Sequence, residues 1–134
     1  MLRDIHHVAF VVQSVDAAAE SLERCMGIRF LWRKAFPERG VDLAIYRLGN
    51  TFLEVTAPTG PESPLATFLA QRGPGVHHVA FGVTDVAESL AVLNERGCPL
   101  LDQRPTVGTS GWTVAPLDTG AVLGVALQMV QLAE

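Results

Sequence analysis

The sequence lacks any hydrophobic run long enough to cross a membrane. A spanning helix needs roughly 20 consecutive apolar residues, and no stretch of the 134 residues approaches that length. The first residues, Met1 to Asp4, also lack the apolar core of a signal peptide. We therefore expect a soluble, cytoplasmic protein that has no membrane partner.

Positive charge and cysteine are scarce as well. The net charge is -4 and the pI is about 5.5, and no run of basic residues is longer than Arg33-Lys34. Nucleic-acid binding needs a basic surface, so we expect no nucleic-acid partner. Cys25 and Cys98 are far apart and lack the spacing of a metal motif, so both are predicted to be buried, reduced thiols.

A repeated pentapeptide dominates what is present. His-His-Val-Ala-Phe occurs at His6–Phe10 and again at His77–Phe81, an offset of 71 residues. Each copy has an apolar residue before it and a valine-rich stretch after it, a pattern that predicts a strand running into a helix. The chain is therefore interpreted as one βαβββ module used twice.

The remaining elements follow from local signals. Ser14 and Asp16 offer caps for a helix that ends near Gly27, and Ser63 offers a cap for a short helix after a turn-rich linker. We predict a single α+β domain over residues 1–134, with module 1 at about 4–57, a linker helix region at about 58–74 and module 2 at about 75–132. Strands are predicted at 5–13, 28–33, 41–48, 51–56, 76–84, 99–103, 112–116 and 122–130, and helices at 17–26, 64–71 and 85–96.

Four polar side chains recur at matching places in the two modules. His7 and His78 lie in the first strands, and Glu54 and Gln128 lie in the last strands. Strand alternation places the other histidines, His6 and His77, on the opposite face, where we expect them to pack or to form hydrogen bonds near the helix. A buried carboxylate or amide without a partner costs roughly 1 to 3 kcal/mol, so a metal, a hydrogen-bond network or a wet cleft is expected there.

The chain resembles the vicinal oxygen chelate superfamily, and within it the methylmalonyl-CoA epimerases. The resemblance rests on both His-His segments and on motifs spread over nearly the whole chain. These are Leu48-Gly49-Asn50-Thr51, Leu53-Glu54-Val55, Ala57-Pro58, Ser63-Pro64-Leu65-Ala66, Phe68-Leu69, Gly75-Val76, Arg96-Gly97, Leu100-Leu101-Asp102, Pro105 and Val107-Gly108.

The resemblance implies an open, cup-shaped mixed sheet around one divalent metal ion (Co²⁺, Mn²⁺, Ni²⁺ or Zn²⁺). It implies His7, Glu54, His78 and Gln128 as metal ligands. Gln128 stands where the epimerases normally carry a glutamate that also acts as a base, and an amide cannot accept a proton at working pH. We therefore assign the catalytic base to Glu54, which occupies the symmetry-related place, and consider Asp42 or a metal-bound water as the second proton carrier.

The implied activity is epimerisation of methylmalonyl-CoA or a similar 2-substituted acyl-CoA by 1,1-proton transfer through a metal-stabilised enolate. A glyoxalase I-like lyase or isomerase acting on a hemithioacetal, and a non-catalytic small-molecule binding protein, are the alternatives. A ring-cleaving dioxygenase is less favoured. The resemblance also implies a homodimer.

Further groups near the substrate are considered as well. Arg33, Lys34 and Arg39 are candidate contacts to CoA phosphates, with exposed solvated charge as the other interpretation. Residues 107–111 are a candidate loop for a substrate carboxylate, although a plain loop explains them equally well.

Overall fold

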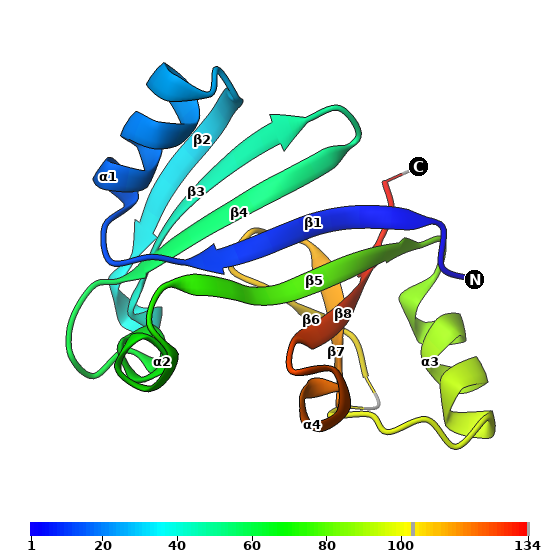
Figure 1. The fold of residues 1–134 in the computed structure, drawn as a ribbon. Coiled ribbons are helices and arrows are strands. Elements are labelled where there is room, and N and C mark those ends of the chain that lie inside the picture. The colour runs from blue at the N-terminus through cyan, green and yellow to red at the C-terminus, as the bar shows by residue number, and fades with distance from the viewer. Residues whose placement is uncertain (103, 134) are drawn as a thin grey trace. The chain divides into compact units, whose positions relative to one another are not determined.

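The computed structural model describes residues 1–102 and 104–133, and in it the chain forms two compact units. The continuous unit is His7–His77, and the discontinuous unit joins Met1–His6 to the chain from His78 onward. In chain order the elements are β1 (Asp4–Val11), α1 (Val15–Ala19), η1 (Glu20–Cys25), β2 (Arg29–Phe36), η2 (Pro37–Arg39), β3 (Val41–Leu48), β4 (Thr51–Pro58), α2 (Pro64–Arg72), β5 (Gly75–Val83), α3 (Val86–Glu95), β6 (Thr106–Val107), β7 (Thr113–Leu117), α4 (Gly120–Leu123) and β8 (Ala126–Gln131) (Figure 1).

These elements confirm the predicted α+β fold with two βαβββ modules. Hydrogen bonds link the described strands in the order β2-β3-β4-β1-β5-β8-β7-β6. The parallel pairs are β1 with β4 and β5 with β8, and the pairs β2/β3, β3/β4, β6/β7 and β7/β8 are antiparallel. The boundary between the units falls inside both His-His pairs, so β1 and β5 each contribute residues to both units.

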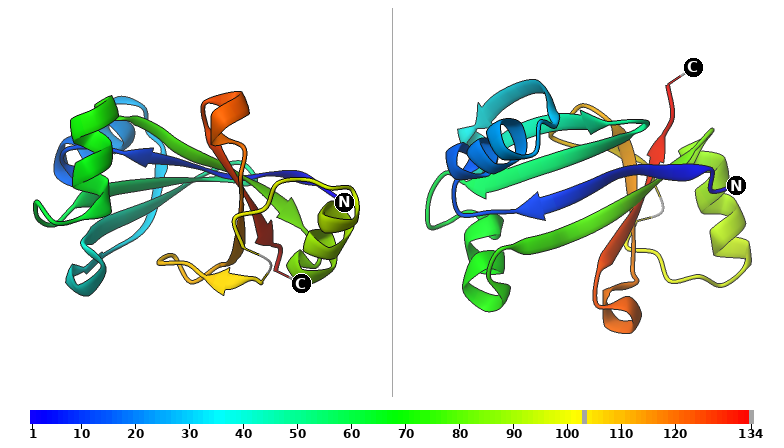
Figure 2. Two further views of the ribbon diagram at one scale, coloured as in Figure 1. Left: turned by 90° about the horizontal axis from the view of Figure 1, so that it is seen from below. Right: turned by 45° about the horizontal axis from the view of Figure 1, so that its top comes forward.

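The core of the continuous unit lies between α1 and one face of its strands. Ala44, Tyr46, Val55 and Ala57 are buried on that face and pack with Val15. The right view of Figure 2 shows α1, in blue, beside these strands. Because side chains alternate along a strand, the residues between them point to the opposite face, which holds His7 and Glu54.

A buried tyrosine ties this core to the second helical segment. Tyr46 is fully buried, and its hydroxyl donates a hydrogen bond to Oε2 of Glu23 at 2.9 Å. Glu23 lies in η1, a π-helical segment that follows α1 directly. Burial, together with the hydrogen bond to Glu23, raises the pKa of Tyr46 to about 12.

Alkaline titration is expected to show this burial directly. Tyr46 is the only tyrosine, so ultraviolet absorbance of tyrosinate reports on one group, with a midpoint near 12 in the folded protein. Because tyrosine in the unfolded chain loses this proton near its ordinary pKa of 10.0, stability should fall as pH rises from 10 towards 12. The Tyr46→Phe variant should lack that dependence, and a wild-type midpoint near 10 at a pH where the protein is still folded would contradict the assignment.

The discontinuous unit has its own core beneath α3. Val83, Val86, Leu90, Ala115 and Met129 are buried together. The first residues of the chain belong here, since the amide of Arg3 donates to the carbonyl of Gly82 at 2.9 Å. The unit therefore has a core that is separate from the one under α1.

Most local predictions are confirmed. Ser14 caps α1 through the amide of Ala17 at 3.2 Å, and Ser63 caps α2 through the amide of Leu65 at 3.1 Å. Gly27 follows the first helical segment with the left-handed φ of 68° that its predicted role requires.

Three predictions are wrong. Two concern strands in the second half of the chain, and the third concerns the burial of the cysteines. The predicted strand 99–103 is not formed by residues 99–102, which make one isolated bridge, Leu100 to Leu117, and Gln103 lies outside the described residues. The predicted strand 122–130 begins only at Ala126, because α4 precedes it and the Thr119 hydroxyl accepts a hydrogen bond from the amide of Leu127. The cysteines are free but not buried: Cys25 is exposed and Cys98 is intermediate.

No helix among the described residues is long and apolar enough to cross a membrane.

Candidate functional site

The continuous unit brings His7 and Glu54 together. In the parallel β1/β4 pair His7 is opposite Phe52, and Ala9 is opposite Glu54, so both polar side chains lie on the same face. Nε2 of His7 is 3.4 Å from Oε2 of Glu54. The two predicted ligands of this unit therefore converge on one point.

Burial makes this pair unusual. The His7 side chain is 1% exposed and that of Glu54 is 12% exposed. Their neighbours on the same face of β1 are Ala9 and Val11, which are buried and apolar. An imidazole and a carboxylate held in such surroundings are stable only when each has a partner for its polar atoms.

The discontinuous unit repeats this arrangement with one change. In the parallel β5/β8 pair His78 is opposite Ala126 and Ala80 is opposite Gln128. His78 and Gln128 thus have the same register relation as His7 and Glu54. His78 is buried. The side-chain amide of Gln128 makes no hydrogen bond with any other residue in the part of the chain that the structure describes. Each unit therefore presents one imidazole and one side chain with a carbonyl or carboxylate oxygen on a single strand face.

The other two histidines pack against aromatic rings, as predicted. The His6 ring lies edge-on to Trp112, with centroids 4.6 Å apart, and the His77 ring is tilted against Phe68 at 5.2 Å. Burial lowers the pKa of His6, and the negative charge of Asp4 offsets part of this effect. Burial also lowers the pKa of His77, and the nearby Arg72 adds to this effect. Neutral imidazoles that pack in this way support a structural role for both residues.

Asp42 cannot serve as the second proton carrier from its position. It is opposite Ala57 in the β3/β4 pair, whereas Ile45 is opposite Glu54, so Asp42 and Glu54 point to opposite faces. Its carboxylate is engaged by Arg33, whose Nη2 is 2.8 Å from Oδ2. This ion pair could not be predicted, because the sequence does not show that Arg33 on β2 and Asp42 on β3 point to the same face of the sheet.

Residues 107–111, the candidate loop for binding a substrate carboxylate, form a turn through their own backbone hydrogen bonds. The amide of Gly108 donates to the carbonyl of Trp112 at 2.9 Å, and the amide of Gly111 donates to the carbonyl of Gly108 at 3.0 Å. Two of the backbone donors that a substrate would need are therefore already used, and the plain-loop interpretation is favoured.

Two cation–aromatic pairs on the Glu54 face were not predicted. The guanidinium of Arg47 lies 5.3 Å from the centroid of the Phe52 ring, and Nζ of Lys34 lies 5.1 Å from that of Phe36. Arg47 is opposite Phe52, which is itself opposite His7. The alternation of the strands was the signal that could have placed these cations on the functional face.

Sequence comparison agrees with this arrangement of strands and polar residues. The model of the Glyoxalase/Bleomycin resistance protein/Dioxygenase superfamily matches residues 6–115. The chain belongs to this superfamily. The match includes His7, Glu54 and His78 and ends before Gln128.

Several similar members of the superfamily are epimerases. The ethylmalonyl-CoA/methylmalonyl-CoA epimerase of Cereibacter sphaeroides is 30% identical over 135 residues, which cover 98% of this chain and 100% of that protein. The uncharacterized protein YqjC of Bacillus subtilis is 31% identical over 122 residues, covering 89% and 87%. A variant of Streptomyces coelicolor methylmalonyl-CoA epimerase in complex with 2-nitronate-propionyl-CoA has a TM-score of 0.87 at 29% identity, covering 99% of this chain and 96% of that one.

Proposed function

We propose that the protein is a metal-dependent epimerase of methylmalonyl-CoA or a similar 2-substituted acyl-CoA. The observation that carries the proposal is the convergence of His7 and Glu54 at 3.4 Å, beside the buried apolar residues Ala9 and Val11 of β1. The similarity to epimerases over nearly the full chain supports the reaction and the thioester substrate.

The donor set fits a divalent metal ion. His7, Glu54 and His78 offer two imidazoles and one carboxylate, a combination that could hold such an ion, and Gln128 would add an amide oxygen. A bound ion would act as a Lewis acid on the thioester oxygen, an effect worth several kcal/mol. The proposed ligands are thus the four predicted residues.

Glu54 is the proposed base. Among the strand residues of the continuous unit it is the one carboxylate on its face, because Asp42 points to the other face and Leu43 and Ile45 are apolar. Its carboxylate would take the proton from C2 of the acyl group. Inversion requires that a proton return to the opposite side of this carbon, so the second carrier must come from outside this strand face.

A substitution at Gln128 tests whether a second carboxylate would speed proton transfer. A Gln128→Glu variant should exchange the α-proton about tenfold faster or more, because it adds a carboxylate in the register position that matches Glu54. The measurement is deuterium incorporation from D₂O, followed by mass spectrometry. An unchanged rate in a folded, metal-loaded variant would show that this position does not limit proton transfer.

The experiment that tests the function combines metal analysis with exchange. Purified protein loaded with each candidate metal in turn is incubated with methylmalonyl-CoA in D₂O, and deuterium at C2 is measured. Near-stoichiometric metal and exchange would support the epimerase. Metal without exchange would contradict it and direct attention to a hemithioacetal substrate, as for a glyoxalase, whereas tight ligand binding without metal would indicate a binding protein.

A further inference from the structure

The three basic residues near the end of β2 do not share one environment. Arg33 is opposite Ala44, so it lies on the α1 face, where it pairs with Asp16 and Asp42. Lys34 is opposite Leu43, which is opposite Thr56, so Lys34 lies on the face of Glu54. Only one of the two adjacent cations therefore faces the proposed substrate side.

Lys34 is well suited to bind an anion. It is the only lysine in the sequence and is exposed. Its ammonium group lies 5.1 Å from the centroid of the Phe36 ring and makes no ion pair with any residue in the described ranges. A cation held over an aromatic ring keeps its hydrogen-bond donors available for a second, anionic partner.

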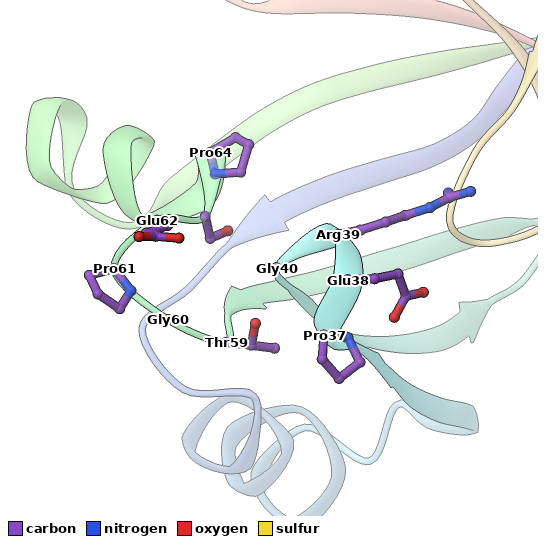
Figure 3. A pocket seen from close by; sticks show the side chains of 10 residues that line it. Pro37, Glu38, Arg39, Gly40, Thr59, Gly60, Pro61, Glu62 and Pro64 are labelled. Atoms are coloured by element: carbon purple, nitrogen blue, oxygen red, sulfur yellow. The ribbon is translucent and has the colours of Figure 1, made fainter.

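A cavity begins where β2 and β4 end. It has a volume of about 710 Å³ and lies between η2 with Gly40 and the segment Thr59–Pro64. Figure 3 shows Pro61 and Glu62 on one wall and Pro37 of η2 on the other. The volume falls in the range of pockets that bind drug-sized ligands.

The two walls of the cavity are fixed to each other. The amide of Thr59 donates to the carbonyl of Gly40 at 3.1 Å and so joins the two walls, while the amide of Ser63 donates to the carbonyl of Gly60 at 3.2 Å within the second wall. Gly40 has a φ of 71°, and a Cβ added there would be 2.8 Å from Cβ of Ser63. The glycine therefore allows close contact between the walls, and the cavity is formed before any ligand binds.

The distance from Glu54 to the cavity matches the length of a coenzyme arm. Pro58, the last residue of β4, lies four residues beyond Glu54, or about 14 Å along the strand. An extended pantetheine arm, which separates a thioester from the phosphates of CoA, has a comparable length. Lys34 lies beside this path, opposite Leu43 and level with Thr56.

We propose that the cavity receives the adenosine diphosphate end of the acyl-CoA and that Lys34 binds its phosphates. The inference rests on the proposed acyl-CoA substrate. The proline rings of the walls offer apolar contact for the adenine, and the carboxylates of Glu38 and Glu62 can accept hydrogen bonds from ribose hydroxyls or the adenine amino group. Lys34 and Arg39 supply the positive charge that the phosphates need.

Binding of coenzyme A itself tests this inference, because it requires no turnover. By calorimetry, Lys34→Ala should raise the Kd for coenzyme A about five- to tenfold, whereas pantetheine should bind as it does to the wild type. Lys34→Arg should restore most of the affinity. Arg24→Ala removes an exposed cation of the same unit in η1 and is the matched control, with an unchanged Kd expected.

Because Lys34 is the only lysine in the sequence, chemical acetylation of its side chain provides a second measurement. Coenzyme A should slow acetylation of this one side-chain amine by acetic anhydride, while pantetheine should not. Equal Kd values for wild type and Lys34→Ala, or acetylation that coenzyme A does not slow, would overturn the inference.

Exchange assays separate this inference from the proposed function. If the wild type exchanges the α-proton of methylmalonyl-pantetheine, but Lys34→Ala does not weaken coenzyme A binding, the epimerase stands and the cavity assignment falls. If Lys34-dependent coenzyme A binding is found without exchange of either thioester, the cavity assignment stands and the epimerase falls.

Discussion

Replacing Glu54 with glutamine is expected to lower the rate of α-proton exchange by about 10² to 10⁴. The substitution keeps the shape of the side chain and an oxygen that can bind a metal, but it removes the group that accepts the proton. The loss should therefore appear in kcat, while the metal content stays close to that of the wild type. Mass spectrometry of methylmalonyl-CoA in D₂O measures the first quantity, and elemental analysis measures the second.

An exposed glutamate supplies the control for this prediction. Glu20→Gln changes the same functional group in η1, where the side chain is 60% exposed and pairs with Arg24, and it should leave exchange unchanged. If Glu54→Gln retained more than about a tenth of the wild-type rate with its metal bound, Glu54 would not be the base, since a general base contributes at least about a hundredfold.

The second large effect is expected on metal binding. His78→Ala should weaken binding of the divalent ion by at least about a hundredfold, because loss of a direct ligand costs more than the 10- to 100-fold typical of an outer-shell change. His7→Ala should have the same effect. Elemental analysis after dialysis against a weak chelator measures the loss.

The neighbouring histidines make the comparison specific. His77→Asn changes the imidazole next to His78 in the sequence, but this ring packs against Phe68, so the metal content should not fall. A lower melting temperature is acceptable in that variant, since it loses an aromatic contact. Equal metal loss in His77→Asn and His78→Ala would show that the strand is being disrupted and would contradict direct ligation by His78.

Repeated sequence made much of the fold predictable. Two copies of one pentapeptide, each followed by a capped helix that ends at a glycine, fix the start of both modules because every local signal agrees. The second half was harder to predict. Val122 and Leu123 favour a strand by composition, but their amides donate to the carbonyl of Thr119 in the short helix α4, which ends at Gly124 in the left-handed conformation.

The candidate site was predictable where it depended on strand period. The repeat, together with strand alternation, predicts that His7 lies with Glu54 and His78 with Gln128, and the register of each parallel pair places these side chains on one face. Alternation could not decide the role of Asp42, since that role depends on pairing with Arg33 from a neighbouring strand. Nor could it reveal the cavity beside η2, whose walls are formed by segments some twenty residues apart in the sequence.

The division of the chain between the two histidines of each pair has a consequence for biosynthesis. The continuous unit, His7–His77, is complete in the chain once the ribosome has made residue 77. Met1–His6 must wait, because their partners include Gly82 and other residues made afterwards. Vectorial synthesis would therefore let the half with His7 and Glu54 fold first and leave closure of the N-terminal hexapeptide as a late step of high contact order.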